Sequence, residues 1–339
     1  MESTGTELAR WKVPVPDVEV IRNDYAEGWH GVPIHYTVYG RGEPAIVCCN
    51  GVGVSTFFWK YVVRYFAPHC RVVTWDYRGH NSSGLPKAMT HESFSMRTNA
   101  RDLAAVLDAA GIERAVLLGH SMGCQVILEL WHQFPDRVAG LVPICGPYGR
   151  PLDTFANIPG LAQPIFDIFH QVATTWPREL EQVLRPLLRT RIPYDIARLG
   201  IINDQLAAFD DMQPYFEHLS EMKIEVFFLM AHEMQRHDAG PWLSLVNVPT
   251  LVVAGEHDLF TPHSLSEEMR QRIPGAELLL LPKGSHAGLI EHPELLNLRL
   301  EKFLRERVRP WLRRSQGSRP KLAAVAKRAP RSSSKKRAR

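Results

Sequence analysis

The sequence predicts an α/β fold, with a parallel sheet covered by helices on both faces, and three observations support this. The first 145 residues alternate short apolar, β-branched runs with helical patterns, as in chains of strand–helix–strand units. Residues 151–246 then carry prolines, aromatics and helical faces but no convincing strand. The alternation returns at Val248. We therefore expect a core made of residues 1–150 and 246–312, interrupted by a helical cap insertion over residues 151–245.

The expected strands are short. Val32, Ile34, Tyr36 and Val38 alternate with other side chains before a Gly-Arg-Gly turn, whereas residues 45–49 form a continuous apolar run that is typical of a strand buried on both faces. In chain order, strands are predicted over residues 32–38, 45–49, 71–75, 115–118, 138–145, 248–254 and 276–281.

The expected helices follow from apolar positions that recur on one face. In residues 95–110 these positions are Leu103, Val106, Leu107 and Ala110, and Gly111 is the stop signal. Further helical segments are predicted over residues 122–134, 180–188, 215–235, 264–272 and 293–307.

The segment around Ser121 predicts a nucleophile. An apolar strand runs into Gly119-His120-Ser121-Met122-Gly123, a G-x-S-x-G pattern, and a helix follows. The two glycines remove side chains that would collide in such a sharp turn, and the N-terminus of the helix favours negative charge that develops beside the serine. A glycine-flanked structural turn is the alternative.

A serine hydroxyl needs a base at neutral pH. His286 is the best candidate among fifteen histidines, because it follows an expected strand and the loops after parallel strands share one sheet edge with Ser121. His292, the nearby alternative, has the pattern of a helix start.

The same argument predicts the acid that orients the base. Asp258 and Glu256 both follow the strand expected over residues 248–254, so both would lie at the edge that carries His286. We favour Asp258 and keep Glu256 as the competitor.

These motifs carry a family resemblance. The Ser-Asp-His order, with Gly255-Glu256-His257-Asp258 and Gly284-Ser285-His286, resembles the α/β-hydrolase fold family over residues 18–308, most closely its cap-bearing esterases, monoacylglycerol lipases and enol-lactonases. The resemblance implies an eight-stranded, mostly parallel sheet with a helical cap after the sixth strand. It also implies a serine hydrolase that cleaves carboxylic esters or lactones through an acyl-enzyme. The alternatives are C–C bond hydrolysis, acyl transfer, and ligand binding without catalysis.

The resemblance also implies an oxyanion hole. Its donors would be the backbone N–H groups of Met122 and, in the loop after residues 45–49, Val52. Asn50 stands where the family usually has His, which leaves the internal hydrogen bonds of this loop open. Asn81 replaces a glycine, and we expect it to tolerate the same positive φ. Cys124 replaces another glycine and is either a reactive thiol or, as we favour, a small buried residue.

The candidate substrate pocket is apolar. We expect Phe57, Phe58 and Trp59 to line it, together with His120 beside the nucleophile and Phe166 from the cap. No cluster of Arg or Lys in the core indicates a phosphate or a multiply charged acid, so a small apolar acyl ester or lactone is the expected substrate.

No cofactor or metal is expected. The sequence contains no dinucleotide-binding or Walker pattern, and the five cysteines lack metal-ligand spacing, which favours reduced core thiols. His232 and His237 lie near acids, but we interpret them as solvated helix residues.

The charge is distributed unevenly. Residues 313–339 contain eleven Lys or Arg and no acid; without them, 29 basic and 36 acidic residues leave a net charge of −7. We expect this tail to be disordered and to act as a solubilising segment, a nucleic-acid tether or a tether to an anionic surface. Because no apolar signal or membrane-spanning run is present, we expect a cytoplasmic protein. The oligomeric state is not predicted.

Overall fold

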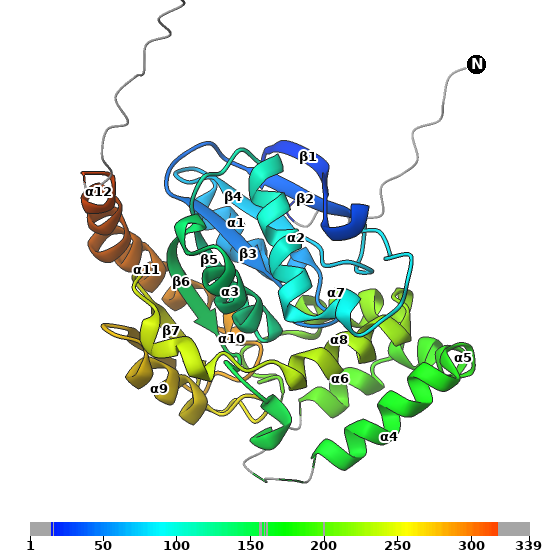
Figure 1. Cartoon of the computed structure of the whole chain (residues 1–339). Helices are drawn as coiled ribbons and strands as arrows, with labels where there is room; N and C mark the ends of the chain where they lie inside the picture. The colour runs from blue at the N-terminus through cyan, green and yellow to red at the C-terminus, as the bar shows by residue number, and fades with distance from the viewer. Residues whose placement is uncertain are drawn as a thin grey trace, which may run out of the picture.

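One eight-stranded sheet forms the centre of the computed structural model, which describes residues 15, 17–155, 158, 160, 162–198 and 201–317 (Figure 1). The strand order is β1-β2-β4-β3-β5-β6-β7-β8. The pairs β1–β2 and β2–β4 are antiparallel and the other neighbours are parallel, which confirms the predicted mostly parallel, eight-stranded sheet. The strands are β1 (Val20–Glu27), β2 (Pro33–Tyr39), β3 (Ala45–Cys49), β4 (Val72–Trp75), β5 (Ala115–His120), β6 (Val138–Ile144), β7 (Leu251–Gly255) and β8 (Glu277–Leu281).

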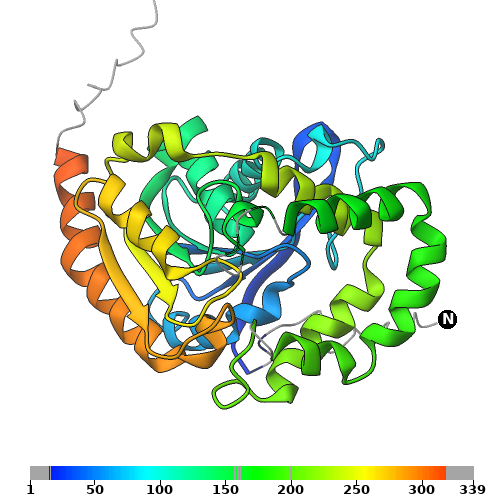
Figure 2. The ribbon, with the colours of Figure 1, turned by 90° about the horizontal axis from the view of Figure 1, so that it is seen from below.

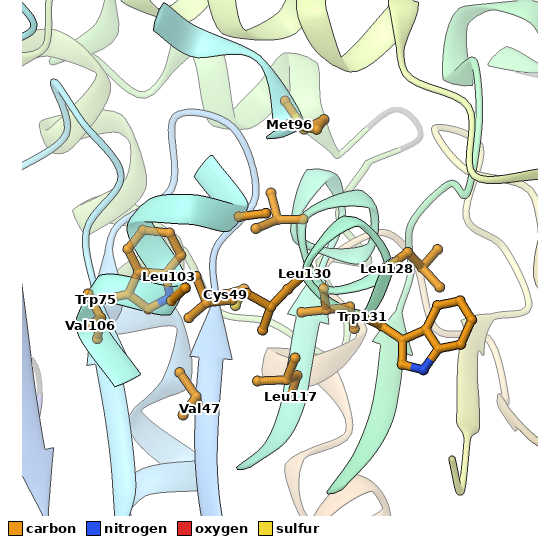
Figure 3. Packing of buried hydrophobic residues seen from close by; sticks show 14 of the residues in the cluster. Val47, Cys49, Trp75, Met96, Leu103, Val106, Leu117, Leu128, Leu130 and Trp131 are labelled. Atoms are coloured by element: carbon orange, nitrogen blue, oxygen red, sulfur yellow. The ribbon is translucent and has the colours of Figure 1, made fainter. Parts of the chain in front are cut away.

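Helices cover both faces of this sheet, and the side-chain alternation of its strands explains why. In β3, Val47 and Cys49 point to one apolar cluster, whereas Ile46 and Cys48 point to the other. The first cluster includes α2 (Met96–Ala109), α3 (Met122–Gln133) and α9 (His263–Arg272); the second includes α1 (Lys60–Phe66), α10 (Gly288–Glu291) and α11 (Pro293–Phe303). Figure 3 shows the first cluster, with strand residues such as Leu117 facing Leu103 of α2 and Leu130 of α3.

Local signals set the bounds of α2. The Ser95 hydroxyl accepts a hydrogen bond from the Thr98 N–H at 3.2 Å and caps the first turn. Gly111, with φ of +66°, follows the helix, and the Ile112 N–H returns to the Leu107 carbonyl. The stop predicted at Gly111 is therefore where the helix ends.

Between β6 and β7 the described residues form five α-helices, two short 3-10 helices and no strand. The α-helices are α4 (Ala162–Thr175), α5 (Pro177–Leu188), α6 (Ile192–Ala197), α7 (Phe209–Glu221) and α8 (Ile224–Arg236). Figures 1 and 2 place them together on one side of the sheet, away from α11 and α12 (Arg309–Gly317).

Several elements differ from the sequence prediction: α1, α4 and α6 lie where no individual helix was predicted, and three further differences follow. β1 was not expected, because it is an edge strand with mainly exposed polar side chains and shows no apolar alternation. The helix predicted over residues 215–235 is two helices, because Met222 and Lys223 are extended and the Glu181 carboxylate accepts the Ile224 N–H at 3.1 Å. The tail was predicted to be disordered from residue 313, but α12 continues to Gly317. Residues 318–339 lie outside the described part of the chain.

Within the described residues, no helix combines the length and the apolar character needed to cross a membrane.

Candidate active site

Ser121 lies in a strained turn between β5 and α3. Its φ of 54° and ψ of −122° are unusual for a residue with a side chain. The backbone is crowded on both sides: a Cβ on Gly119 would lie 2.3 Å from the Gly123 carbonyl oxygen, and one on Gly123 would lie 2.3 Å from that of Cys49. Both positions therefore require glycine, and the turn holds the Ser121 hydroxyl at the N-terminus of α3.

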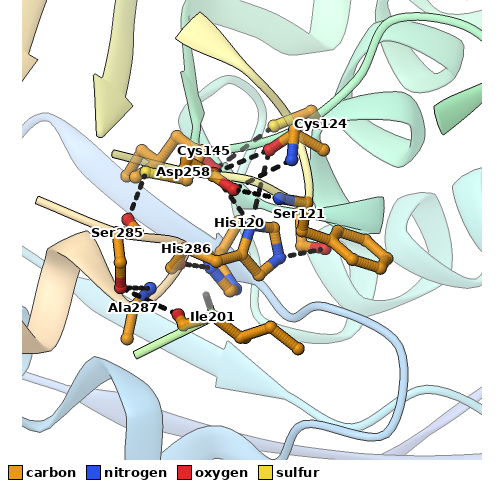
Figure 4. A network of polar contacts seen from close by, with 12 residues as sticks. His120, Ser121, Cys124, Cys145, Ile201, Asp258, Ser285, His286 and Ala287 are labelled. Atoms are coloured by element: carbon orange, nitrogen blue, oxygen red, sulfur yellow. Dashed lines mark hydrogen bonds and ion pairs between the residues drawn. The ribbon is translucent and has the colours of Figure 1, made fainter. Parts of the chain in front are cut away.

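A chain of hydrogen bonds joins the three predicted residues (Figure 4). His286 Nε2 lies 3.0 Å from Ser121 Oγ, and His286 Nδ1 lies 2.9 Å from Asp258 Oδ2. His286 and Asp258 follow β8 and β7, so the parallel sheet brings both to the edge where β5 ends. In this arrangement the imidazole can take a proton from the hydroxyl.

Asp258 is fixed by its own loop. Its Oδ1 accepts the N–H groups of Phe260 at 2.9 Å and Thr261 at 2.8 Å, and its Oδ2 accepts the Thr261 hydroxyl at 2.8 Å as well as His286 Nδ1. The residue is 3% exposed. Glu256, the competitor, is exposed and accepts the Lys283 N–H instead. His292 lies at the boundary of α10 and α11, in agreement with its helix-start pattern.

The predicted oxyanion loop lies against the nucleophile. A Cβ on Gly51 would be 3.1 Å from the Cβ of Ser121, so this glycine allows the loop to approach closely. Met122 is the first residue of α3, where a backbone N–H has no acceptor within the helix. The N–H of Val52 donates to no backbone carbonyl of the described chain.

Asn50, which stands where the resemblance led us to expect histidine, forms hydrogen bonds that hold this loop. Its side-chain amide donates to the Trp75 carbonyl at 2.9 Å and accepts Trp59 Nε1–H at 2.8 Å. Its own carbonyl accepts the Tyr77 hydroxyl. Asn50 therefore links the loop to Trp59, Trp75 and Tyr77.

His80 was not predicted as a site residue, but it supports the same loop. His80 Nε2 accepts the Gly53 N–H at 3.1 Å, which places its proton on Nδ1, 3.3 Å from the Arg78 carbonyl. Burial lowers the pKa of His80 to about 4, so the ring is neutral and can act as this acceptor at neutral pH.

Glu291 was also missed, and it holds the loop that carries His286. Its two carboxylate oxygens accept the N–H and hydroxyl of Ser285 and the N–H of Asn203. The Ser285 hydroxyl also contacts the Ile201 carbonyl at 2.8 Å. The base is thereby linked to the segment between β6 and β7.

A cavity of about 440 Å³ opens above Ser121 and His286. Helices α5 and α7 line it with apolar side chains such as Leu188, Met212 and Phe216. Val52, Phe58 and His120 line the opposite side. None of the described residues that line the cavity is Lys, Arg, Asp or Glu.

Three residues predicted to line the pocket lie elsewhere. Phe57 and Trp59 pack into the core, where the Trp59 indole reaches Asn50. Phe166 lies in a separate apolar groove of α4, α5 and α8 that adjoins the cavity through Leu188 and Phe227. Phe57 and Trp59 were predicted from their position after the loop and Phe166 from the apolar composition of the cap, and neither criterion specifies the direction of a side chain.

Two other predicted residues are neutral and buried. Burial, and then the neighbouring His286, lower the pKa of His120 to about 3, and its Nε2–H donates to the His286 carbonyl at 2.9 Å. Burial raises the pKa of the Cys124 thiol, which donates to the Gly119 carbonyl, as expected for a small packing residue. All five cysteines are buried and free. Asn81 adopts a φ of 41°, the positive value expected for it.

Comparisons with known proteins agree with this architecture. A family model described as alpha/beta hydrolase fold matches residues 44–293. The putative carbamate hydrolase RutD of Azorhizobium caulinodans is 27% identical over 287 residues, which cover 83% of this chain and 98% of the relative. A 2-hydroxy-6-oxononadienedioate/2-hydroxy-6-oxononatrienedioate hydrolase of Burkholderia vietnamiensis is 29% identical, over 80% of this chain and 91% of the relative. Among solved structures, Est816, an N-acyl homoserine lactone degrading enzyme, superimposes with a TM-score of 0.65 at 26% identity, over 82% of this chain and 99% of that one.

Proposed function

The chain belongs to the alpha/beta hydrolase fold family and is by family a hydrolase, and from this premise we propose that it cleaves carboxylic ester or lactone bonds of small apolar acyl substrates. The observation that carries the proposal is the hydrogen-bonded chain Ser121–His286–Asp258 at the base of an apolar cavity.

The proposed reaction has two steps. Ser121 Oγ attacks the acyl carbon while its proton moves to His286 Nε2, and the carbonyl oxygen becomes an oxyanion. The N–H groups of Met122 and Val52 would stabilise that oxyanion. Collapse of the intermediate expels the alcohol, which takes the proton from His286 and leaves an acyl-enzyme. Water, with His286 again as base, then releases the acid and restores Ser121.

Asp258 has a separate role in this proposal. Its carboxylate accepts the Nδ1–H of His286, so the lone pair on Nε2 faces Ser121. The same contact stabilises the imidazolium that forms after proton transfer.

The cavity supports an apolar substrate. Each methylene that moves from water into such a lining contributes about 0.8 kcal/mol. A carboxylate on the substrate would lose its hydration with no cationic partner among the described lining residues, which costs several kcal/mol. We therefore infer a neutral acyl group.

We propose that residues 151–245 act as a cap over a core of residues 1–150 and 246–312. The support is that α5, α7 and α8 line one side of the cavity, whereas Ser121 and His286 lie on the other. An ion pair between Lys60 of α1 and Asp211 of α7 connects the two parts.

C–C bond hydrolysis is the second candidate, because the Burkholderia vietnamiensis relative is named for this kind of substrate at 29% identity. That name specifies a dioate. A dioate carries two carboxylates, and the described residues that line the cavity include no Lys or Arg to pair with them. We therefore rank C–C bond hydrolysis second.

A substrate panel tests the proposal. Neutral p-nitrophenyl esters of increasing acyl length would be compared with a succinate half-ester of similar size, an N-alkyl carbamate and a 2-hydroxy-6-oxodienoate. We expect the highest kcat/KM for a neutral ester. The kcat/KM of the charged half-ester should be at least about tenfold lower, which corresponds to about 1.4 kcal/mol. Faster cleavage of the dienoate or the carbamate would replace the ester proposal, and faster cleavage of the half-ester would refute the inference of a neutral substrate.

A further inference from the structure

Three histidines that are far apart in the sequence meet at one point. His91 lies just before the short helix η4 (Glu92–Phe94), His170 lies on α4 and His232 lies on α8. Each histidine offers one ring nitrogen as a ligand atom, and these three nitrogens all lie within 4.8 Å of one another. The ring centroids of His91 and His170 are 4.3 Å and 4.7 Å from that of His232. His232, which we expected to be solvated, instead packs against the other two rings.

The polar surroundings of the cluster suit a cation. Glu233 Oε1 is hydrogen-bonded to Nδ1 of His232 at 3.3 Å and lies 3.1 Å from Nδ1 of His91, which is buried and has no hydrogen bond in the described chain. The Nε2 atom of His170 is buried and has no hydrogen-bond partner in the described chain. The His91 side chain is 44% exposed, so a small ion can reach the cluster from solvent.

We propose that His91, His170 and His232 bind a divalent transition metal, with Zn²⁺ as the best match, and that Glu233 orients the ring of His232. Imidazole nitrogens are preferred ligands of Zn²⁺, at 2.0–2.1 Å. In a tetrahedral site such ligands lie about 3.3 Å apart. The distance between any two of the nitrogens would therefore have to shorten by at most about 1.5 Å on metal binding. A carboxylate that holds one ring nitrogen fixes the orientation of the other toward a metal.

The position of the site suggests what the metal would do. None of the three histidines lines the cavity at Ser121, so the metal is not placed to take part in ester cleavage. His170 and His232 belong to the segment between β6 and β7, whereas His91 belongs to the segment between β4 and α2. A shared ion would therefore fasten α4 and α8 to the core. This inference does not depend on the proposed function.

The test uses the full chain after treatment with a chelator. Zn²⁺ titration by calorimetry and thermal unfolding would be measured for wild type, His170→Ala, His232→Gln and Glu233→Gln. His263→Ala, at an exposed histidine of α9, is the matched control. Co²⁺ would serve as a spectroscopic probe, because its visible absorption reports coordination geometry.

We expect wild type and His263→Ala to bind one Zn²⁺ per chain with a gain in Tm of about 5 °C at saturation. The 1:1 binding should disappear in His170→Ala and His232→Gln, and Glu233→Gln should bind about 10–100-fold more weakly. Intense, tetrahedral-type Co²⁺ absorption should appear in wild type and be lost in whichever histidine variant is folded by circular dichroism. Absence of 1:1 binding in wild type would overturn the proposal, as would equal binding by His170→Ala, His232→Gln and wild type.

Discussion

Replacement of Asp258 by Asn removes one negative charge and preserves the shape of the side chain. The N–H groups of Phe260 and Thr261 both donate to Oδ1, so that position must remain an oxygen. The new amide nitrogen then takes the place of Oδ2 and faces His286 Nδ1 across the present 2.9 Å contact. An NH₂ group there forces Nδ1 to accept a hydrogen bond and moves the imidazole proton to Nε2.

The wrong tautomer determines the size of the effect. With a proton on Nε2, His286 cannot accept the proton of Ser121. The corresponding loss in a serine protease is about 10⁴-fold in kcat, or about 5 kcal/mol, and we expect a similar value for Asp258→Asn. The change in KM should be small, because Asp258 does not line the cavity.

The assay is steady-state hydrolysis of the best p-nitrophenyl ester at neutral pH. Glu256→Gln is the matched control, since Glu256 is exposed in the same loop and Gln retains an oxygen for the Lys283 N–H. It should retain wild-type kcat within about twofold, as expected for a surface substitution. A folded Asp258→Asn variant within tenfold of wild type would show that Asp258 does not set the tautomer of His286, and an equal loss in Glu256→Gln would indicate Glu256 as the orienting carboxylate.

Three other predictions concern the scaffold. His80→Ala removes the acceptor of the Gly53 N–H in the predicted oxyanion loop and should lower kcat up to about 10²-fold with KM nearly unchanged, whereas a change in KM alone would contradict this positioning role. Burial lowers the pKa of His218 to about 3, so the unfolded chain binds more protons below pH 6.5 and stability falls as the pH decreases from 6.5 toward 3. Over that interval the free energy of unfolding of His218→Gln should fall by up to about 1.4 kcal/mol less per pH unit than that of wild type. Thermal unfolding at several pH values measures this dependence, and the same slope in variant and wild type would contradict the prediction. Gly119→Ala should destabilise by about 3 kcal/mol because its Cβ meets backbone, whereas Gly111→Ala has open space and should cost about 1 kcal/mol, the penalty of its positive φ; equal losses in denaturant unfolding would argue against crowding at the turn.

The sequence predicted the parts of the site that lie directly after strands. Ser121, Asp258 and His286 each follow an apolar strand, and a parallel sheet brings such positions to one edge. The hydrogen bonds among them could therefore be anticipated from chain order and local pattern, without knowledge of the packing.

The supporting residues could not be predicted in the same way. His80 and Glu291 act through contacts with Gly53 and Asn203, which are set by tertiary packing rather than by spacing. The same limit applies to the aromatic residues: Phe58 lines the cavity, whereas its neighbour Phe57 does not. The local course of the backbone determines which of two neighbouring side chains faces the cavity, and composition alone does not predict that course.

Cleavage of one neutral ester by wild type and Ser121→Ala, at equal concentration and neutral pH, tests whether Ser121 is the nucleophile. We expect turnover by wild type and a loss of about 10⁴–10⁶-fold in the folded variant, because Ser121 is the only Ser, Thr or Cys among the described residues that line the cavity. Turnover by Ser121→Ala within tenfold of wild type would contradict the assignment of the nucleophile.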